Sequence, residues 1–286
     1  SNAWLNINGA GLNATIAGGT HNFTGTLQRK GLGMSGGGSI TVSGGNVTTV
    51  NITVGNGGSG TYTQSGGTVA AALVQLGSAG NASSISIFNL DGGVFQAGQL
   101  APNAGWLGTT TINLNGGTFQ ASGSSANIFS PTVSGSQPGS VFVKAGGAVI
   151  DSNGNDITNS SSLLTHPTST GGGLIKLGLG TLTLSGVNTY TGTTTISNGT
   201  LLVNGSLAAG SAVTVLTNAT LGGTGTIGGT VTVNAGGSVI PGNSALGTLT
   251  ISNNLTLNAG AGAVFRLNRT NAPATNDSLV VSGTQN

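Results

Sequence analysis

Few side chains in this sequence can act as acids, bases or metal ligands. The chain has four acidic residues, all of them Asp, with two His and no Cys. Only Asp151 and Asp156 lie close together, in the segment Asp-Ser-Asn-Gly-Asn-Asp. Oxygen-rich loops of this kind can bind Ca²⁺, here through Asp151, Asn153, Asn155 and Asp156, although their order differs from EF-hand spacing. Turns prefer the same residue types, so we predict a turn, with a weak calcium site as the alternative.

The other titratable side chains are too scattered to predict an enzyme. Glycoside hydrolases need two carboxylates that converge on one bond, and lyases need clustered acids or metal-assisted bases. Asp91 and Asp277 each stand alone in the sequence. His21 and His166 have no second histidine, cysteine or acid at the spacing that metal ligands require. We therefore expect no catalytic residue, no metal ion and no cofactor.

Two short glycine motifs imitate enzyme signatures. Residues 33–37 (Gly-Met-Ser-Gly-Gly) fit the nucleophile elbow of hydrolases, but that motif needs a following helix and a paired His and Asp. Residues 31–36 and 55–60 fit the Gly-x-Gly-x-x-Gly dinucleotide fingerprint. At this glycine content chance predicts about two such matches, so we read them as coincidences.

Charge and hydropathy exclude two further classes of protein. Nucleic-acid binding needs a dense basic stripe that displaces counterions from the phosphates. The six cations are instead scattered along the chain: Arg29, Lys30, Lys144, Lys176, Arg266 and Arg269. No run of 18 apolar residues occurs, so we expect no membrane-spanning helix. Residues 1–3 (Ser-Asn-Ala) resemble the remainder of a cleaved expression tag.

The composition favours strands and turns over helices. Only 3% of the residues are charged, against roughly a quarter in ordinary soluble domains. Glycine accounts for 55 residues, while hydrophobic residues make up 36%, which is too many for a disordered chain. Because Thr, Ser and Asn must cover the surface, we predict short buried strands separated by tight glycine turns, with essentially no α-helix.

A repeated unit of strand, Gly-Gly and strand sets the fold. The glycine pairs are Gly44–Gly45, Gly66–Gly67, Gly92–Gly93 and Gly116–Gly117. They start at positions 44, 66, 92 and 116, so the successive spacings are 22, 26 and 24. One coil of a parallel β-helix needs three short strands and three bends, or roughly 20–25 residues. At about 22–24 residues per coil, the whole chain makes roughly 12 coils of an all-β solenoid.

The pattern divides the chain into parts. Residues 4–150 read as solenoid coils with Gly-Gly corners, interrupted by a loop at 123–140. Residues 151–172 are polar and irregular, so we predict an excursion from the solenoid there. Residues 173–286 return to short alternating strands, and we expect them to continue the first part.

The C-terminal part resembles the autotransporter-associated β-strand repeat, a passenger-associated repeat of bacterial surface proteins. The residues that carry this likeness are Gly173, Leu174, Lys176, Leu182, Leu184, Gly186, Asn188, Tyr190 and Gly192. The resemblance covers about 172–285 and implies a right-handed parallel β-helix, secreted and displayed on the surface of a Gram-negative-type bacterium. The repeat contributes no catalytic residues.

Aromatic and threonine residues keep other binding functions open. Phe88, Phe95, Phe119 and Phe142 follow the coil pattern and are expected in a stacked core. Trp4 and Trp106 are expected to pack, with sugar platforms as the alternative. Thr-x-Thr pairs occur at 109/111, 181/183, 193/195, 224/226, 230/232 and 248/250, where flat rows would suit ice binding.

Three functions follow from these observations. The first is a non-enzymatic structural or adhesive rod, in which neighbouring repeats or other copies of the chain stack end to end. The second is a β-helix that binds or cleaves carbohydrate, with host or environmental glycans as partners. The third is an ice-binding or surface-binding solenoid. We predict the first.

Overall fold

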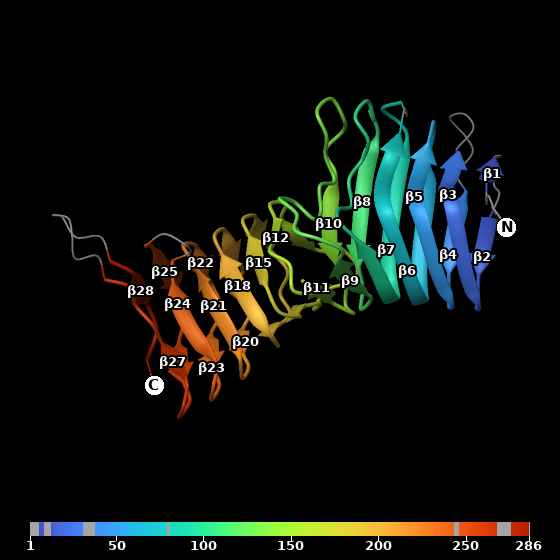
Figure 1. The fold of residues 1–286 in the computed structure, drawn as a ribbon. Coiled ribbons are helices and arrows are strands. Elements are labelled where there is room, and N and C mark those ends of the chain that lie inside the picture. The colour runs from blue at the N-terminus through green and yellow to red at the C-terminus, as the bar shows by residue number, and fades with distance from the viewer. Residues whose placement is uncertain are drawn as a thin grey trace.

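The computed structural model describes residues 6–8, 13–30, 38–78, 81–242, 246–267 and 276–285. Their regular secondary structure consists of β-strands joined by turns, with no helix among the described residues. The strands stack in coils along one axis, with β1 and β2 at one end and β27 and β28 at the other (Figure 1). The predicted all-β parallel solenoid is confirmed.

The N-terminal strands include the longest in the chain. Their bounds are β1 (Asn6–Asn8), β2 (Asn13–Ile16), β3 (Thr20–Lys30), β4 (Ser39–Val42), β5 (Asn46–Asn56), β6 (Gly60–Ser78), β7 (Ile85–Ala97), β8 (Thr109–Leu114), β9 (Thr118–Ala121), β10 (Ser140–Val143) and β11 (Ala148–Asp151).

The C-terminal strands are all short. Their bounds are β12 (Ile157–Asn159), β13 (Leu163–Thr165), β14 (Leu174–Leu177), β15 (Thr181–Leu184), β16 (Val187–Asn188), β17 (Thr194–Ile196), β18 (Gly199–Val203), β19 (Ser206–Leu207), β20 (Val213–Val215), β21 (Ala219–Gly223), β22 (Thr226–Ile227), β23 (Val231–Val233), β24 (Ser238–Pro241), β25 (Thr248–Ile251), β26 (Leu255–Leu257), β27 (Gly262–Ala263) and β28 (Ser278–Val281).

The strands form parallel ladders in which each coil contributes one strand to each side. One ladder runs β2, β4, β6, β7, β8, β10 and β13, and continues through β16, β19, β22, β25 and β28. A hydrogen bond from Thr189 N to Leu163 O joins its two halves. One strand per coil along this ladder agrees with the expected roughly 12 coils.

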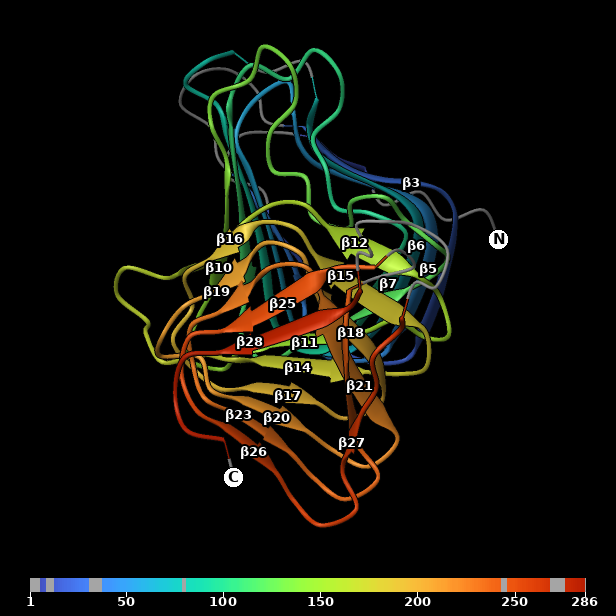
Figure 2. The ribbon, with the colours of Figure 1, turned by 90° about the vertical axis from the view of Figure 1, so that its left-hand side faces the viewer.

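Coil length differs between the two halves. Paired residues of β4 and β6, β6 and β7, and β7 and β8 are 22, 26 and 24 positions apart, as the glycine spacing predicts. The predicted coil length is wrong for three coils further on, because the successive offsets along β14, β17, β20 and β23 are only 20, 19 and 18. The offset between β23 and β26 is again 24. The strands there are shorter, and the loops of the N-terminal coils extend beyond the C-terminal coils (Figure 2).

The Gly-Gly pairs occupy corners where the backbone requires glycine. Gly45 has a φ of +76°, and a Cβ atom there would lie 2.5 Å from the carbonyl oxygen of Gly19 in the preceding coil. Gly67 and Gly93 repeat this arrangement with φ of +69° and +70°, each against the preceding glycine of the column. In the fourth pair the first residue, Gly116, takes the positive φ instead. Glycine therefore lets successive coils approach closely.

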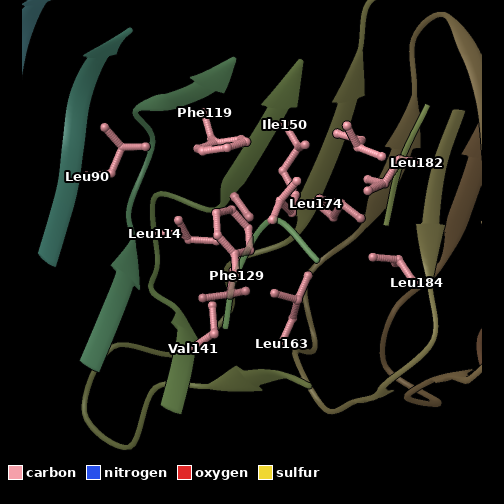
Figure 3. Packing of buried hydrophobic residues seen from close by; sticks show 14 of the residues in the cluster. Leu90, Leu114, Phe119, Phe129, Val141, Ile150, Leu163, Leu174, Leu182 and Leu184 are labelled. Carbon is pink, nitrogen blue, oxygen red and sulfur yellow. The ribbon is translucent and has the colours of Figure 1, made fainter. Parts of the chain in front are cut away.

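The core lies inside the coils, as alternation requires. Tyr62 stacks on Phe88 with ring centroids 4.9 Å apart, and Phe95 meets Phe88 edge-on at 4.9 Å. Phe119 contacts Phe129 at 5.0 Å, and Figure 3 shows both among aliphatic side chains of neighbouring coils. Phe129 comes from the loop predicted at 123–140, so that loop also fills the core.

The prediction that Phe142 lies in the core is wrong. Its neighbours in β10, Val141 and Val143, are both buried, so alternation places Phe142 on the outer face. There its ring packs against the imidazole of His166, with centroids 5.3 Å apart. A strand with three consecutive apolar residues does not reveal which face is inside.

The predicted excursion at 151–172 is also wrong for most of its length. β12 pairs with β15 and β13 pairs with β10, so this segment forms a coil of the solenoid. Ile157 and Leu163 are buried in the core. The polar composition misleads because polar residues fill not only the turns but also buried positions such as Ser152 and Asn159. β11 pairs with β14, so the parts predicted at 4–150 and 173–286 belong to one stack.

Candidate functional site

The acidic segment after β11 folds as a tight turn. Asn153 and Gly154 have φ of +50° and +80°. Oδ1 of Asp151 accepts a hydrogen bond from Asn153 N at 2.8 Å, and the Asn155 amide donates to the carbonyls of Ser152 and Asn153. This bonding supports the predicted turn.

Both carboxylates of this turn also join neighbouring coils. Oδ2 of Asp151 accepts from Gln120 Nε2 at 2.9 Å, and Oδ1 of Asp156 accepts from Thr181 N at 2.9 Å. Within the described part of the chain, no group of three or more His, Cys, Asp or Glu residues could hold a metal ion. The carboxylates therefore act as coil-to-coil acceptors.

A buried lysine lies beside this turn. Lys176 points inward from β14 and is fully buried. Its Nζ donates to Ser152 Oγ, Leu177 O and Gly178 O at 2.8 Å each, and to Asn198 O at 3.3 Å. Ser152 belongs to the preceding coil and Asn198 to the turn that ends β17, so one ammonium group connects three coils.

Burial and the nearby carboxylates act on this lysine in opposite directions. Loss of solvent lowers the pKa of Lys176 from 10.5 to about 8, while Asp151 and Asp156 act to raise it. Because that pKa remains above 7, the ammonium is protonated at neutral pH. The oxygen-rich turn, read from sequence as a calcium candidate, thus provides acceptor groups and negative charge near an internal cation.

The other polar residues of the repeat signature form buried networks. Asn188 accepts from Leu163 N at 2.9 Å and donates to the carbonyls of Gly186 and Ser206 at 3.0 Å. The Tyr190 hydroxyl lies 2.6 Å from Thr194 Oγ1, which lies 2.8 Å from Ser211 Oγ. Burial raises the pKa of Tyr190 to about 12.

The apolar and glycine residues of the signature set the packing. Leu174, Leu182 and Leu184 are fully buried. A Cβ atom on Gly186 would lie 2.7 Å from Ser161 O, and a Cβ on Gly173 or Gly192 would overlap the backbone of an adjacent coil. These residues hold coils together, and nothing in their arrangement resembles a catalytic centre.

Several other candidates have structural positions. Trp106 is fully buried, so it is no sugar platform. The Nδ1 atom of His166 faces Thr168, and His21 lies in β3 opposite Val47. The glycines of 55–60 lie at the end of β5, in the turn after it and at the start of β6, with no helix following. Trp4, residues 1–3 and the motifs within 31–37 lie outside the described residues.

The Thr-x-Thr pairs contribute to rows that are one residue wide. Thr195, Thr214, Thr232 and Thr256 are consecutive partners on the ladder from β17 to β26. The positions two residues later hold Ser197, Leu216, Asn234 and Asn258. The positions two residues earlier hold Thr193, Ala212, Thr230 and Asn254, so neither side carries a second continuous threonine row.

A surface hollow at a corner of the N-terminal coils was not foreseen from the sequence. It has a volume of about 310 Å³, and its lining includes Ala72, Gln75, Gly98, Gln99 and Ser124. No charged side chain lines it. A Cβ atom on Gly98 would meet only Ser122 Oγ, at 3.7 Å, so this position has open space in front of it.

Comparison with known proteins agrees with the repeat resemblance. Residues 174–203, from β14 to β18, match the passenger-associated-transport-repeat family. No curated protein and no solved structure matches the chain. No helix in the described residues is long and apolar enough to cross a membrane.

Proposed function

We propose that this chain, a passenger-associated-transport-repeat protein, is a secreted, non-enzymatic rod displayed on the surface of a Gram-negative-type bacterium. One observation carries the proposal: a single set of parallel ladders runs from β2 to β28, through the matched repeat and well beyond it. A continuous solenoid of this kind suits the role of holding binding regions away from a cell.

The positions of the acidic residues support a role without catalysis. Asp91 accepts from the Asn115 amide, and Asp277 is paired with Arg266 at 2.7 Å. Together with the two turn carboxylates described above, these acids take part in hydrogen bonds that join strands or coils. Catalysis needs acids free to meet a substrate and converging on one bond.

The C-terminal end of the stack supports end-to-end association as part of this function. In the described residues β27 pairs only with β24 and β28 only with β25, so their outer edges lack a partner strand. Val264, Phe265 and Val280 are exposed close to these edges. An exposed parallel edge with apolar side chains is a template for another strand, which a neighbouring repeat or a second copy of the chain would supply.

Sedimentation velocity over a range of concentrations tests this association. We expect a concentration-dependent shift to larger species, which Val280→Lys reduces by adding charge at the edge. Compact monomers at every concentration would contradict the proposed self-association while leaving the rod itself unaffected.

The corner hollow favours a second candidate function, binding of a neutral glycan. Amide and hydroxyl groups, together with an uncharged lining, suit the hydroxyl groups of neutral sugars. A glycan array is the test, with Gly98→Trp as the variant that fills the hollow. A saturable signal that is lost in Gly98→Trp supports glycan adhesion. Absence of a signal would contradict glycan adhesion and leave the structural rod as the proposed function. The ice-binding alternative is weaker, because its threonine rows are only one residue wide.

A further inference from the structure

The C-terminal strands are similar enough to pair in more than one way. β15, β18 and β25 read Thr-Leu-Thr-Leu, Gly-Thr-Leu-Leu-Val and Thr-Leu-Thr-Ile, and in each the buried residues alternate with less buried ones. A slip by one residue would turn the apolar side chains outward. A slip by two residues, absorbed in the turns, would keep them inside. Hydrophobic alternation alone therefore does not fix the register of these coils.

Lys176 is sensitive to a slip that the apolar residues tolerate. Its Nζ has acceptors in three successive coils, at Ser152, at its own turn and at Asn198. A shift of two residues along a strand moves the ammonium by about 6–7 Å relative to the adjacent coils. The charge would then be buried without its acceptors from those coils, which is strongly unfavourable.

The same contacts do not make this lysine a source of net stability. Removing an ammonium from water is costly, and burial lowers the pKa of Lys176 despite the opposing charges of Asp151 and Asp156. An apolar side chain of similar length would fill the same space without that cost. Fixing a register is the best-attested role for a buried polar group of this kind.

We propose that Lys176 is a register lock, which makes pairing of β14 between β11 and β17 the only arrangement that satisfies its buried ammonium. It lies where the coil offset changes from 26, between Ala148 and Leu174, to 20, between Leu174 and Thr194. At this position a misplaced strand would shift the coils that follow.

Disulfide trapping reads the register directly, because the chain has no cysteine of its own. Ile175 and Thr195 are Cα partners on the outer face. Adjacent strands lie about 4.8 Å apart, so Ile175→Cys with Thr195→Cys closes in the native register. Ile175→Cys with Ser197→Cys reports a slip of two residues, since in the native register that pair is about 8 Å apart and cannot be bridged.

The variant Lys176→Met tests the lock, and Lys144→Met is the matched control on a partly exposed lysine. We expect Lys176→Met to fold with a urea midpoint equal to or above that of the wild type. In that background the slipped pair closes at least about fivefold more than with Lys176 present. Lys144→Met leaves both pairs as in the wild type.

Two results would overturn the proposal. If Lys176→Met folds and the slipped pair stays at the wild-type level, the lysine does not select the register. If Lys176→Met fails to fold, or its urea midpoint falls well below that of the wild type, the lysine is a stabilising group and not a lock.

Discussion

Replacement of Gly199 by alanine tests whether glycine corners hold the coils in contact. Gly199 opens β18 with a φ of +66°, and its Cβ atom would lie 2.5 Å from Gly180 O and 2.6 Å from Gly178 O. The left-handed conformation costs alanine about 1–2 kcal/mol. The backbone shift that would relieve the two overlaps with the adjacent coil adds to this cost. We expect Gly199→Ala to lower the free energy of unfolding by at least about 2 kcal/mol.

Gly98→Ala is the control, because that glycine has no positive φ and open space at its Cβ position. It should change stability by less than about 1 kcal/mol, and a small gain is expected from the stiffer unfolded chain. Urea denaturation followed by circular dichroism measures both variants. Equal losses for Gly199→Ala and Gly98→Ala would refute the reasoning, since position in the corner would then have no effect.

Four further outcomes are expected. Leu182→Ala leaves a cavity in the core and should cost about 2–5 kcal/mol in urea denaturation. The free energy of unfolding should rise with pH from about 8 towards 10.5, because the lowered pKa of Lys176 lets the folded chain lose a proton that the unfolded chain keeps. The variant Lys176→Met should remove this rise. Above pH 10 the raised pKa of Tyr190 should lower stability, and Tyr190→Phe reduces that loss, as pH-dependent melting shows. Hydrogen bonds from Arg266 lower the pKa of Asp277, so the C-terminal coil should lose stability as pH falls below about 4. Hydrogen exchange can detect this loss, and Asp277→Asn should cause a similar loss at neutral pH.

The general fold could be predicted from the sequence because glycine marks the corners. Gly45, Gly67 and Gly93 sit at equivalent points of successive coils, so their spacing equals the coil length. Alternation between these corners then places the core. Both signals are local, and neither needs information about which coils touch.

The failures occurred where local signals were ambiguous. Val141, Phe142 and Val143 are all apolar, so alternation could not orient the strand. Residues 157–165 look irregular in the sequence because their two strands have three residues each, too few to show a period.

The contacts of the buried lysine could not be predicted from the sequence alone. Its place two residues after Leu174 indicates an inward position, which alternation alone could have shown. Its partners, Ser152 and Asn198, are 24 and 22 residues away and become neighbours only once the coils are stacked. The network therefore depends on how the coils stack, and the strand offset at β14 changes from 26 to 20, which the sequence did not predict.

Antibody labelling of intact cells tests most directly the central claim that this solenoid is displayed on the surface of the bacterium that encodes it. An antibody raised against residues 81–242 should label unpermeabilised cells, and external protease should remove that signal while a cytoplasmic marker stays intact. Labelling that appears only after the cells are lysed would contradict surface display.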